Sequence, residues 1–258
     1  MASSGWHYKI AYTDLPRVSA LALGPNNQLY VSLEKRHGTG EVLRIEPNGS
    51  RVTILADLDK PDGMTAYNGG VAITQEDQTR SVIWWHDGIA SELLEARGAE
   101  GLASDGAFLY VVEDQPGSGR LLRYDSRTDE LVTLRRGLDE AEGVAACANG
   151  EIYYTEKESS QVRLVGIDDN DPVVVNHLNK PGFLLCRPEG LWITEDATHG
   201  SRLLLLDQRS QLHVILRHLR TPQSLLAIGG GHYLLAEQGR NRILEVWQTP
   251  EAANNHAQ

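Results

Sequence analysis

Four polar residues stand at equivalent places in a repeated pattern, and their types could bind a cation. Asp62, Glu100 and Glu142 each precede a glycine and a short apolar segment, while Gln223 precedes a serine at the same place. Carboxylates that converge on one point repel one another, so they either take up protons or bind a cation. We therefore expect Asp62, Glu100, Glu142 and Gln223 to bind Ca²⁺, with Mg²⁺ or Mn²⁺ as other candidates. Capping of local backbone amides is the alternative.

A second set of carboxylates recurs where the following apolar segment ends. It consists of Glu113, Glu156, Glu195 and Glu237. A residue reused in nearly every repeat usually serves the structure, so we expect these glutamates to accept hydrogen bonds from loop amides or to pair with arginines that begin the next strand. The candidate partners are Arg120, Arg202 and Arg242. A place in the channel site is the alternative. Blades one and two have Leu33 and Gln75 at this position, and four more carboxylates stand one position later in their repeats: Glu34, Glu76, Asp114 and Asp196.

Two histidines and one glutamate are candidates for acid–base catalysis. His37 lies in the loop KRHGTG and His199 in the loop DATHG, each between the second and third strands of a repeat. Imidazole titrates near neutral pH and could serve as a general base, although most loop histidines are simply solvated. Glu142 is the third candidate. Cys147 and Cys186 occupy equivalent places in neighbouring repeats, and we expect small core residues there rather than nucleophiles.

The elements that position these residues recur with a period near 41. Strand openings at residues 18, 62, 100, 142, 181 and 223 are 38 to 44 residues apart, and each starts a set of short apolar segments separated by Gly, Asn-Gly or Asp-Gly turns. This pattern predicts an all-β, six-bladed β-propeller with four antiparallel strands per blade. The last repeat lacks a fourth strand, so we expect the N-terminal strand to join blade six and close the ring.

We expect one domain over residues 1–258, with blades at about 16–58, 59–97, 98–138, 139–178, 179–220, and 221–248 plus 7–13. The first strand of each blade lines the central channel. Because its start lies on the same face as the turn between the second and third strands, the acidic residues converge at the channel mouth.

Composition limits the partners. The net charge of −11 argues against nucleic acid or an anionic membrane, and no apolar run approaches the roughly 18 residues of a membrane span. MASSGWHYKI shows no signal-peptide pattern, so we expect a cytoplasmic protein unless a signal peptide has been removed. Two cysteines are too few for a disulfide framework. We expect a small-molecule substrate; the oligomeric state stays open, with a monomer as one option.

Short motifs resemble the senescence marker protein / gluconolactonase / luciferin-regenerating family of propellers, within the strictosidine synthase-like superfamily. KPDGMTAYNGGVAIT (Lys60–Thr74) is similar to its Pro-Asp-Gly-Met stretch, and AEGL and AEGV are similar to its Glu-Gly opening. The resemblance implies metal ligation by Asp62, Glu100 and Glu142. The family's Arg-x-Asn-Asp-Gly motif is missing here, and the Asp-Gly-Met stretch lies in blade two, earlier than usual.

These observations favour a divalent-metal-dependent hydrolase acting on a small lactone or ester at the channel mouth. Two alternatives stay open. One is a metal-independent lyase or condensing enzyme that uses a channel glutamate as acid and base. The other is a non-catalytic binding or scaffold propeller. The sequence shows no phosphate-cradling loop, dinucleotide fingerprint or G-x-S-x-G elbow in the strand–helix context that each requires.

Overall fold

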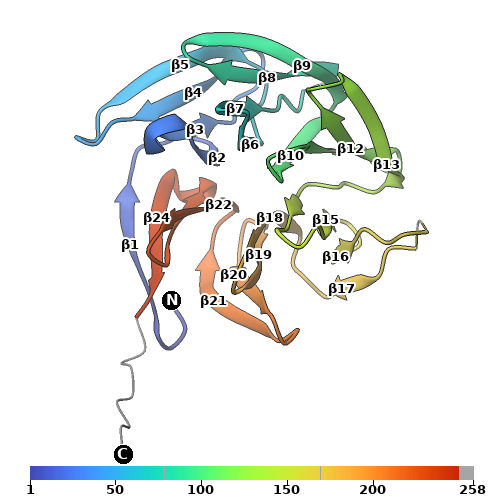
Figure 1. Cartoon of the computed structure of the whole chain (residues 1–258). Helices are drawn as coiled ribbons and strands as arrows, with labels where there is room; N and C mark the ends of the chain where they lie inside the picture. The colour runs from blue at the N-terminus through green and yellow to red at the C-terminus, as the bar shows by residue number, and fades with distance from the viewer. Residues whose placement is uncertain (78, 169, 250–258) are drawn as a thin grey trace, which may run out of the picture.

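The chain forms six four-stranded antiparallel sheets arranged around an axis, a six-bladed β-propeller (Figure 1). The computed structural model describes residues 1–77, 79–168 and 170–249. The strands of blades one to three are β2 Val18–Leu23, β3 Leu29–Leu33, β4 Gly40–Ile45, β5 Arg51–Leu58, β6 Met64–Tyr67, β7 Gly70–Ile73, β8 Thr79–His86, β9 Ile89–Arg97, β10 Ala99–Ser104, β11 Leu109–Glu113, β12 Gly119–Asp125 and β13 Glu130–Leu138. The strands of blades four to six are β14 Val144–Ala146, β15 Ile152–Glu156, β16 Gln161–Leu164, β17 Val173–Val175, β18 Pro181–Arg187, β19 Gly190–Glu195, β20 Ser201–Asp207, β21 Leu212–Leu219, β22 Pro222–Gly229, β23 His232–Glu237, β24 Arg242–Gln248 and the N-terminal β1 Trp6–Tyr12.

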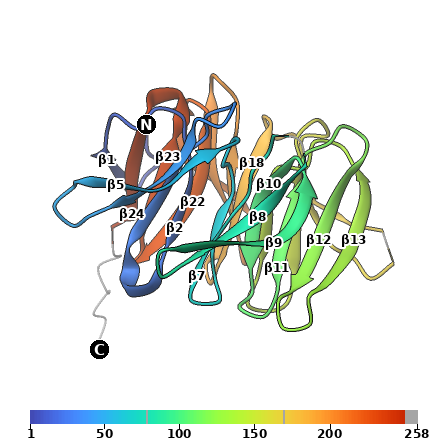
Figure 2. The ribbon, with the colours of Figure 1, turned by 90° about the horizontal axis from the view of Figure 1, so that it is seen from above.

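The ring closes through the N-terminal strand, as the sequence predicts. β1 pairs antiparallel with β24, which gives blade six the order β1-β24-β23-β22. Figures 1 and 2 show β1 on the outside of this blade, beside β24. The pairing protects the β24 edge, which would otherwise be open to other chains. Two short 3₁₀ turns, η1 (Pro25–Asn27) and η2 (Gln238–Arg240), complete the described elements. Within the described ranges, no helix is long and apolar enough to cross a membrane.

The core consists of apolar clusters between adjacent blades. Leu43 and Leu234 belong to the cluster between blades one and six, and equivalent clusters fill the other junctions. The adjacent Trp84 and Trp85 point to opposite faces of their sheet, Trp84 toward blade three and Trp85 toward blade one. Each fully buried leucine in these clusters contributes roughly 1.5–3 kcal/mol. The ring is therefore stabilised by neighbouring blades packing on one another.

Glycine at the start of the first strands lets neighbouring backbones approach closely around the channel. A Cβ on Gly63 would overlap the Glu100 carbonyl oxygen, and one on Gly143 would overlap the Gly182 carbonyl oxygen. The Thr74 hydroxyl accepts a hydrogen bond from the Gly63 amide and donates one to the Glu100 carbonyl, both at 2.7 Å. The recurring Asp-Gly and Glu-Gly pairs therefore combine a channel-facing carboxylate with a residue that admits the next blade.

The structure corrects the prediction for the cysteines. Cys147 and Cys186 form a disulfide with their Cα atoms 5.2 Å apart, linking blades four and five at the ends of their first strands. Two equivalent positions on neighbouring first strands are close enough to be bridged, which is why the pair forms. Disulfides are rare in cytosolic proteins, so this pairing argues against the predicted cytoplasmic location. The location itself stays a prediction.

Candidate functional site

The structure brings the four predicted metal ligands to the channel. Asp62, Glu100, Glu142 and Gln223 are all buried, and each stands at the start of the first strand of its blade. In blade three the β10–β11 register shifts between Ala99 and Leu102, and this bulge contains Glu100. Bulges re-aim side chains and are common beside functional sites. The first strands therefore present carboxylates toward the axis.

A second ring of side chains follows the ends of the second strands. Its members are Glu34, Glu76, Asp114, Lys157, Asp196 and Gln238. Each backbone amide donates to the carbonyl of a residue that precedes the same blade's first strand. These accepting residues, all with positive φ, are Arg17, Lys60, Gly98, Glu140, Lys180 and Thr221. The repeated hydrogen bond fixes where the second ring begins in every blade.

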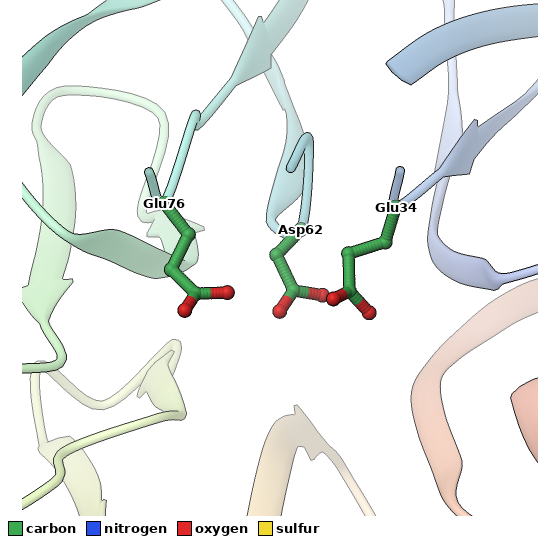
Figure 3. Close-up of side chains that lie close together, drawn as sticks. All are labelled: Glu34, Asp62 and Glu76. Carbon is green, nitrogen blue, oxygen red and sulfur yellow. The ribbon is translucent and has the colours of Figure 1, made fainter. Parts of the chain in front are cut away.

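Three carboxylates meet between blades one and two. Glu34 follows β3, Asp62 precedes β6 and Glu76 follows β7, and one oxygen of each lies within 4.8 Å of the others. Figure 3 shows the three side chains pointing toward a common space, with the Asp62 and Glu34 carboxylates adjacent. Lys60 enters the same cluster and forms ion pairs with Glu76 and with Glu34, the latter at 3.5 Å. We call this group the Lys60 cluster.

A neighbouring group shares Glu76 and adds Glu100 and Asp114, again with one oxygen of each within 4.8 Å. Glu100 is 6 % exposed, and none of the described residues forms a hydrogen bond with its buried Oε2. Asp114 Oδ1 is likewise buried and unpartnered. An unpartnered buried carboxylate oxygen costs free energy, and a cation bound there would remove that cost. We call this group the Glu100 cluster.

Glu142 belongs to a third group, on the other side of Glu100. Its Oε1 forms an ion pair with Lys157, whose Nζ also lies 2.9 Å from Asp196. The Gln223 amide donates to Asp196 at 2.8 Å. Glu142 and Gln223 are therefore occupied by neighbours from the protein itself, unlike Glu100 Oε2.

Crowding and burial raise the pKa values of the central carboxyls. Burial, with a contribution from the Glu34 charge, raises the pKa of Asp62 to about 6, although Lys60 and Ser19 oppose the shift. Burial, Asp62 and Asp114 raise the pKa of Glu100 well above its usual range. The two carboxyls hydrogen-bond to each other, and Glu100 is the member whose pKa the bond raises. Crowding therefore favours a proton on Glu100 more than one on Asp62.

The side chains around the channel, from the first strands and from the second ring together, are strongly acidic even when their lysines are counted. The two ammonium groups of Lys60 and Lys157 lie among seven carboxylates, and Arg17 adds a third cation that pairs with Glu34 at 2.8 Å. The seven are Glu34, Asp62, Glu76, Glu100, Asp114, Glu142 and Asp196. Burial opposes the charge of Lys157, but Asp196 and Glu100 outweigh it and raise its pKa. Lys157 therefore stays charged at neutral pH. The remaining negative charge favours cations and disfavours anionic ligands.

The strand-two glutamates have the structural role that the sequence predicts. Glu195 receives hydrogen bonds from the Arg202 guanidinium and from the Asn179 amide, and Glu237 is paired in the same way with Arg242. Glu113–Arg120 and Glu156–Arg163 repeat the arrangement. These glutamates tie the second strand to the third and point away from the channel carboxylates.

Among the described residues, neither of the two histidines predicted as bases belongs to the carboxylate clusters. His37 and His199 are exposed on their loops, and the clusters of candidate ligands include neither. Sequence reasoning also missed four ring carboxylates, Glu34, Glu76, Asp114 and Asp196, and both lysines. The available signal was an acidic residue at one repeat position, directly after the position of the structural glutamates, which recurs in four blades.

Comparisons with known proteins support the fold. No protein-family model matches the sequence, and no curated protein matches it. Among solved structures, a candidate gluconolactonase superposes with a TM-score of 0.75 and 11% identity, covering 96% of this chain and 94% of the other. A gluconolactonase from Xanthomonas campestris superposes with a TM-score of 0.77 and 13% identity, covering 96% and 91%. These neighbours have the propeller architecture that the sequence motifs imply.

Proposed function

We propose that the chain is a divalent-metal-dependent hydrolase of small lactones or esters, with its site at the channel carboxylates. The observation that carries the proposal is the buried, unpartnered Oε2 of Glu100 within a group of three carboxylates. The likeness to gluconolactonase structures, although distant, favours lactone chemistry over other reactions on this fold. The proposed metal ligands are therefore Glu76, Glu100 and Asp114, and of the four first-strand residues predicted as ligands only Glu100 is kept.

The donor set fits Ca²⁺ better than Mg²⁺. Ligands on opposite sides of Ca²⁺ stand roughly 5 Å apart, whereas those of Mg²⁺ stand roughly 4 Å apart. The oxygens of Glu76, Glu100 and Asp114 lie within 4.8 Å of one another, and Ca²⁺ accepts such an all-carboxylate set with more ligands and looser geometry than Mg²⁺ does. When bound, the cation would supply Lewis acidity toward a substrate carbonyl oxygen.

The chain's own residues supply the proton acceptor and select the substrate. Asp62 adjoins the cluster, and its pKa of about 6 keeps it mostly ionised at neutral pH while close enough to that pH to accept a proton from water. Asp62 thus takes the role that the sequence suggested for His37 or His199. Because carboxylates outnumber ammonium groups around the channel, we expect neutral or cationic substrates to bind better than anionic ones.

A metal titration followed by thermal melting tests the metal requirement. A cation that binds only the folded state at 100 times its dissociation constant adds about 2.7 kcal/mol, or roughly 5–10 °C in Tm for a chain of this size. Glu100→Gln should abolish the shift, while the exposed Glu130→Gln should retain it. Binding should also lower the pKa of Glu100, because a bound cation favours the ionised carboxylate.

Activity is then measured on a panel of neutral lactones and aryl esters with and without a chelator. Activity that Ca²⁺ restores and that Glu100→Gln abolishes supports the metal hydrolase. Activity that survives both the chelator and Glu100→Gln would instead support the acid–base alternative through Asp62. An absence of any Tm shift with Ca²⁺, Mg²⁺ and Mn²⁺ would refute the metal requirement.

A further inference from the structure

Lys60 is placed in the channel by its backbone as well as by its side chain. Its amide donates to the Lys35 carbonyl, next to Glu34, and its carbonyl accepts from the Glu76 amide, at 2.9 and 3.0 Å. The residue has a φ of +47°, a left-handed conformation that is uncommon for residues other than glycine. Lys60 is therefore held between the two second-ring carboxylates that its ammonium group contacts.

The ammonium group contacts two of the three carboxylates of the Lys60 cluster. Lys60 Nζ forms ion pairs with Glu34 and Glu76, and its charge also acts on Asp62. Lys60 is only 8 % exposed, so the contact is shielded from solvent and from salt. Two carboxylates of the Lys60 cluster thus have an internal cation, and Glu34 also pairs with Arg17 at 2.8 Å. In the Glu100 cluster, Lys60 reaches only the shared Glu76, and Glu100 has an unpartnered buried oxygen.

We propose that Lys60 is a tethered cation that keeps a second divalent ion out of the channel. Its ammonium group pairs with Glu34 and Glu76 and offsets part of the charge that they share with Asp62, so that of these two clusters the Glu100 cluster is the one left for a metal. Removing the ammonium group opens a second site that shares Glu76 with the first. This inference rests on the proposed function only for the identity of the first site.

The two clusters are close enough to form a two-metal centre in the variant. Both include Glu76, and in each cluster the candidate oxygens lie within 4.8 Å of one another. Metal ions that share a bridging carboxylate in proteins are roughly 3.5–4 Å apart. Lys60 therefore determines whether the channel holds one ion or two, a choice that changes which oxygens of a substrate can be polarised.

The test uses Mn²⁺ alone on the full chain, with stoichiometry from equilibrium dialysis and electron paramagnetic resonance as a second readout. Lys60→Gln removes the charge, and Lys60→Met keeps the aliphatic stem as a safeguard for folding. Lys35→Gln is the matched control, because Lys35 pairs with Glu41 outside both clusters. Glu34→Gln combined with Lys60→Gln removes a ligand of the new site.

We expect one Mn²⁺ in the wild type and in Lys35→Gln, and two spin-coupled Mn²⁺ in Lys60→Gln and Lys60→Met. The second ion should bind at least about tenfold more tightly than any second ion in the wild type, and the double variant should return to one. If a Lys60 variant folds only with Mn²⁺, the stoichiometry is read on the loaded protein.

The outcomes separate the two proposals. No ion in the wild type but one in Lys60→Gln refutes the proposed metal requirement and supports the role of Lys60. One ion in both, with equal affinity, overturns the role of Lys60 and leaves the proposed function standing. Two ions in the wild type also overturn it, because the ammonium group then excludes nothing. No ion in either protein overturns both.

Discussion

Replacing Asp62 by asparagine should change how stability depends on pH, in the absence of metal. Asp62 is 3 % exposed, and its pKa in the folded protein is about 6, against an ordinary value of 3.8. The folded state therefore binds this proton more tightly than the unfolded state does. The free energy of unfolding contributed by Asp62 is present in full below about pH 4 and is lost as the pH rises to about 6.

The size of the effect follows from the shift. A difference of roughly two pKa units corresponds to about 3 kcal/mol. The amide in Asp62→Asn has no such proton to lose, so the stability of this variant relative to wild type should rise by about 3 kcal/mol between pH 4 and pH 7. Urea unfolding in the presence of a chelator, at several pH values, measures this difference directly.

A second carboxyl provides a control of opposite sign. Asp171 is also buried, but hydrogen bonds from Arg135 and the Gly166 amide outweigh burial and lower its pKa. Asp171→Asn should therefore lose most stability at neutral pH, with a deficit that shrinks as the pH falls. For the Asp62 prediction, a difference in free energy of unfolding between Asp62→Asn and wild type that does not change from pH 4 to pH 7 would refute the crowding of carboxylates in the channel.

Three further perturbations test the framework around the site, each by urea unfolding. Reducing the Cys147–Cys186 disulfide, which closes a separation of 39 residues, should cost up to about 4 kcal/mol; an unchanged midpoint would contradict the link between blades. Gly143→Ala should cost about 1–3 kcal/mol by overpacking against Gly182, and an unchanged stability would argue against the close approach. Glu195→Gln should cost about 1–3 kcal/mol yet leave the Mn²⁺ stoichiometry unchanged, and a lost ion would place this residue in the site instead.

The architecture could be predicted from the sequence because its determinants are local. Short apolar strands, turn residues and a constant period recur along the chain, and each blade repeats the same contacts with its neighbours. The missing fourth strand of the last repeat even predicted the pairing of β1 with β24. The role of the structural glutamates followed from the same repetition, because a residue that recurs in four of the six blades usually serves the structure.

The disulfide could also have been predicted from the positions of the two cysteines in the sequence. Cys147 and Cys186 occupy equivalent places on neighbouring first strands, and that is the distance a disulfide spans. Their number argued for core residues, whereas their equivalent positions argued for a pair. The structure shows that the positions were the better guide.

The arrangement of the site depends on the tertiary structure. Side chains alternate along a strand, so the identity of the channel-facing residue changes with a shift of one position, and Asp114 rather than Glu113 faces the axis. Lys60 and Lys157 have no local sequence feature that distinguishes them from surface lysines. Only the convergence of blades around the axis places their charges among the carboxylates. The sequence determined which residues were available to bind a cation, and the packing of the blades decided which of them the protein neutralises itself.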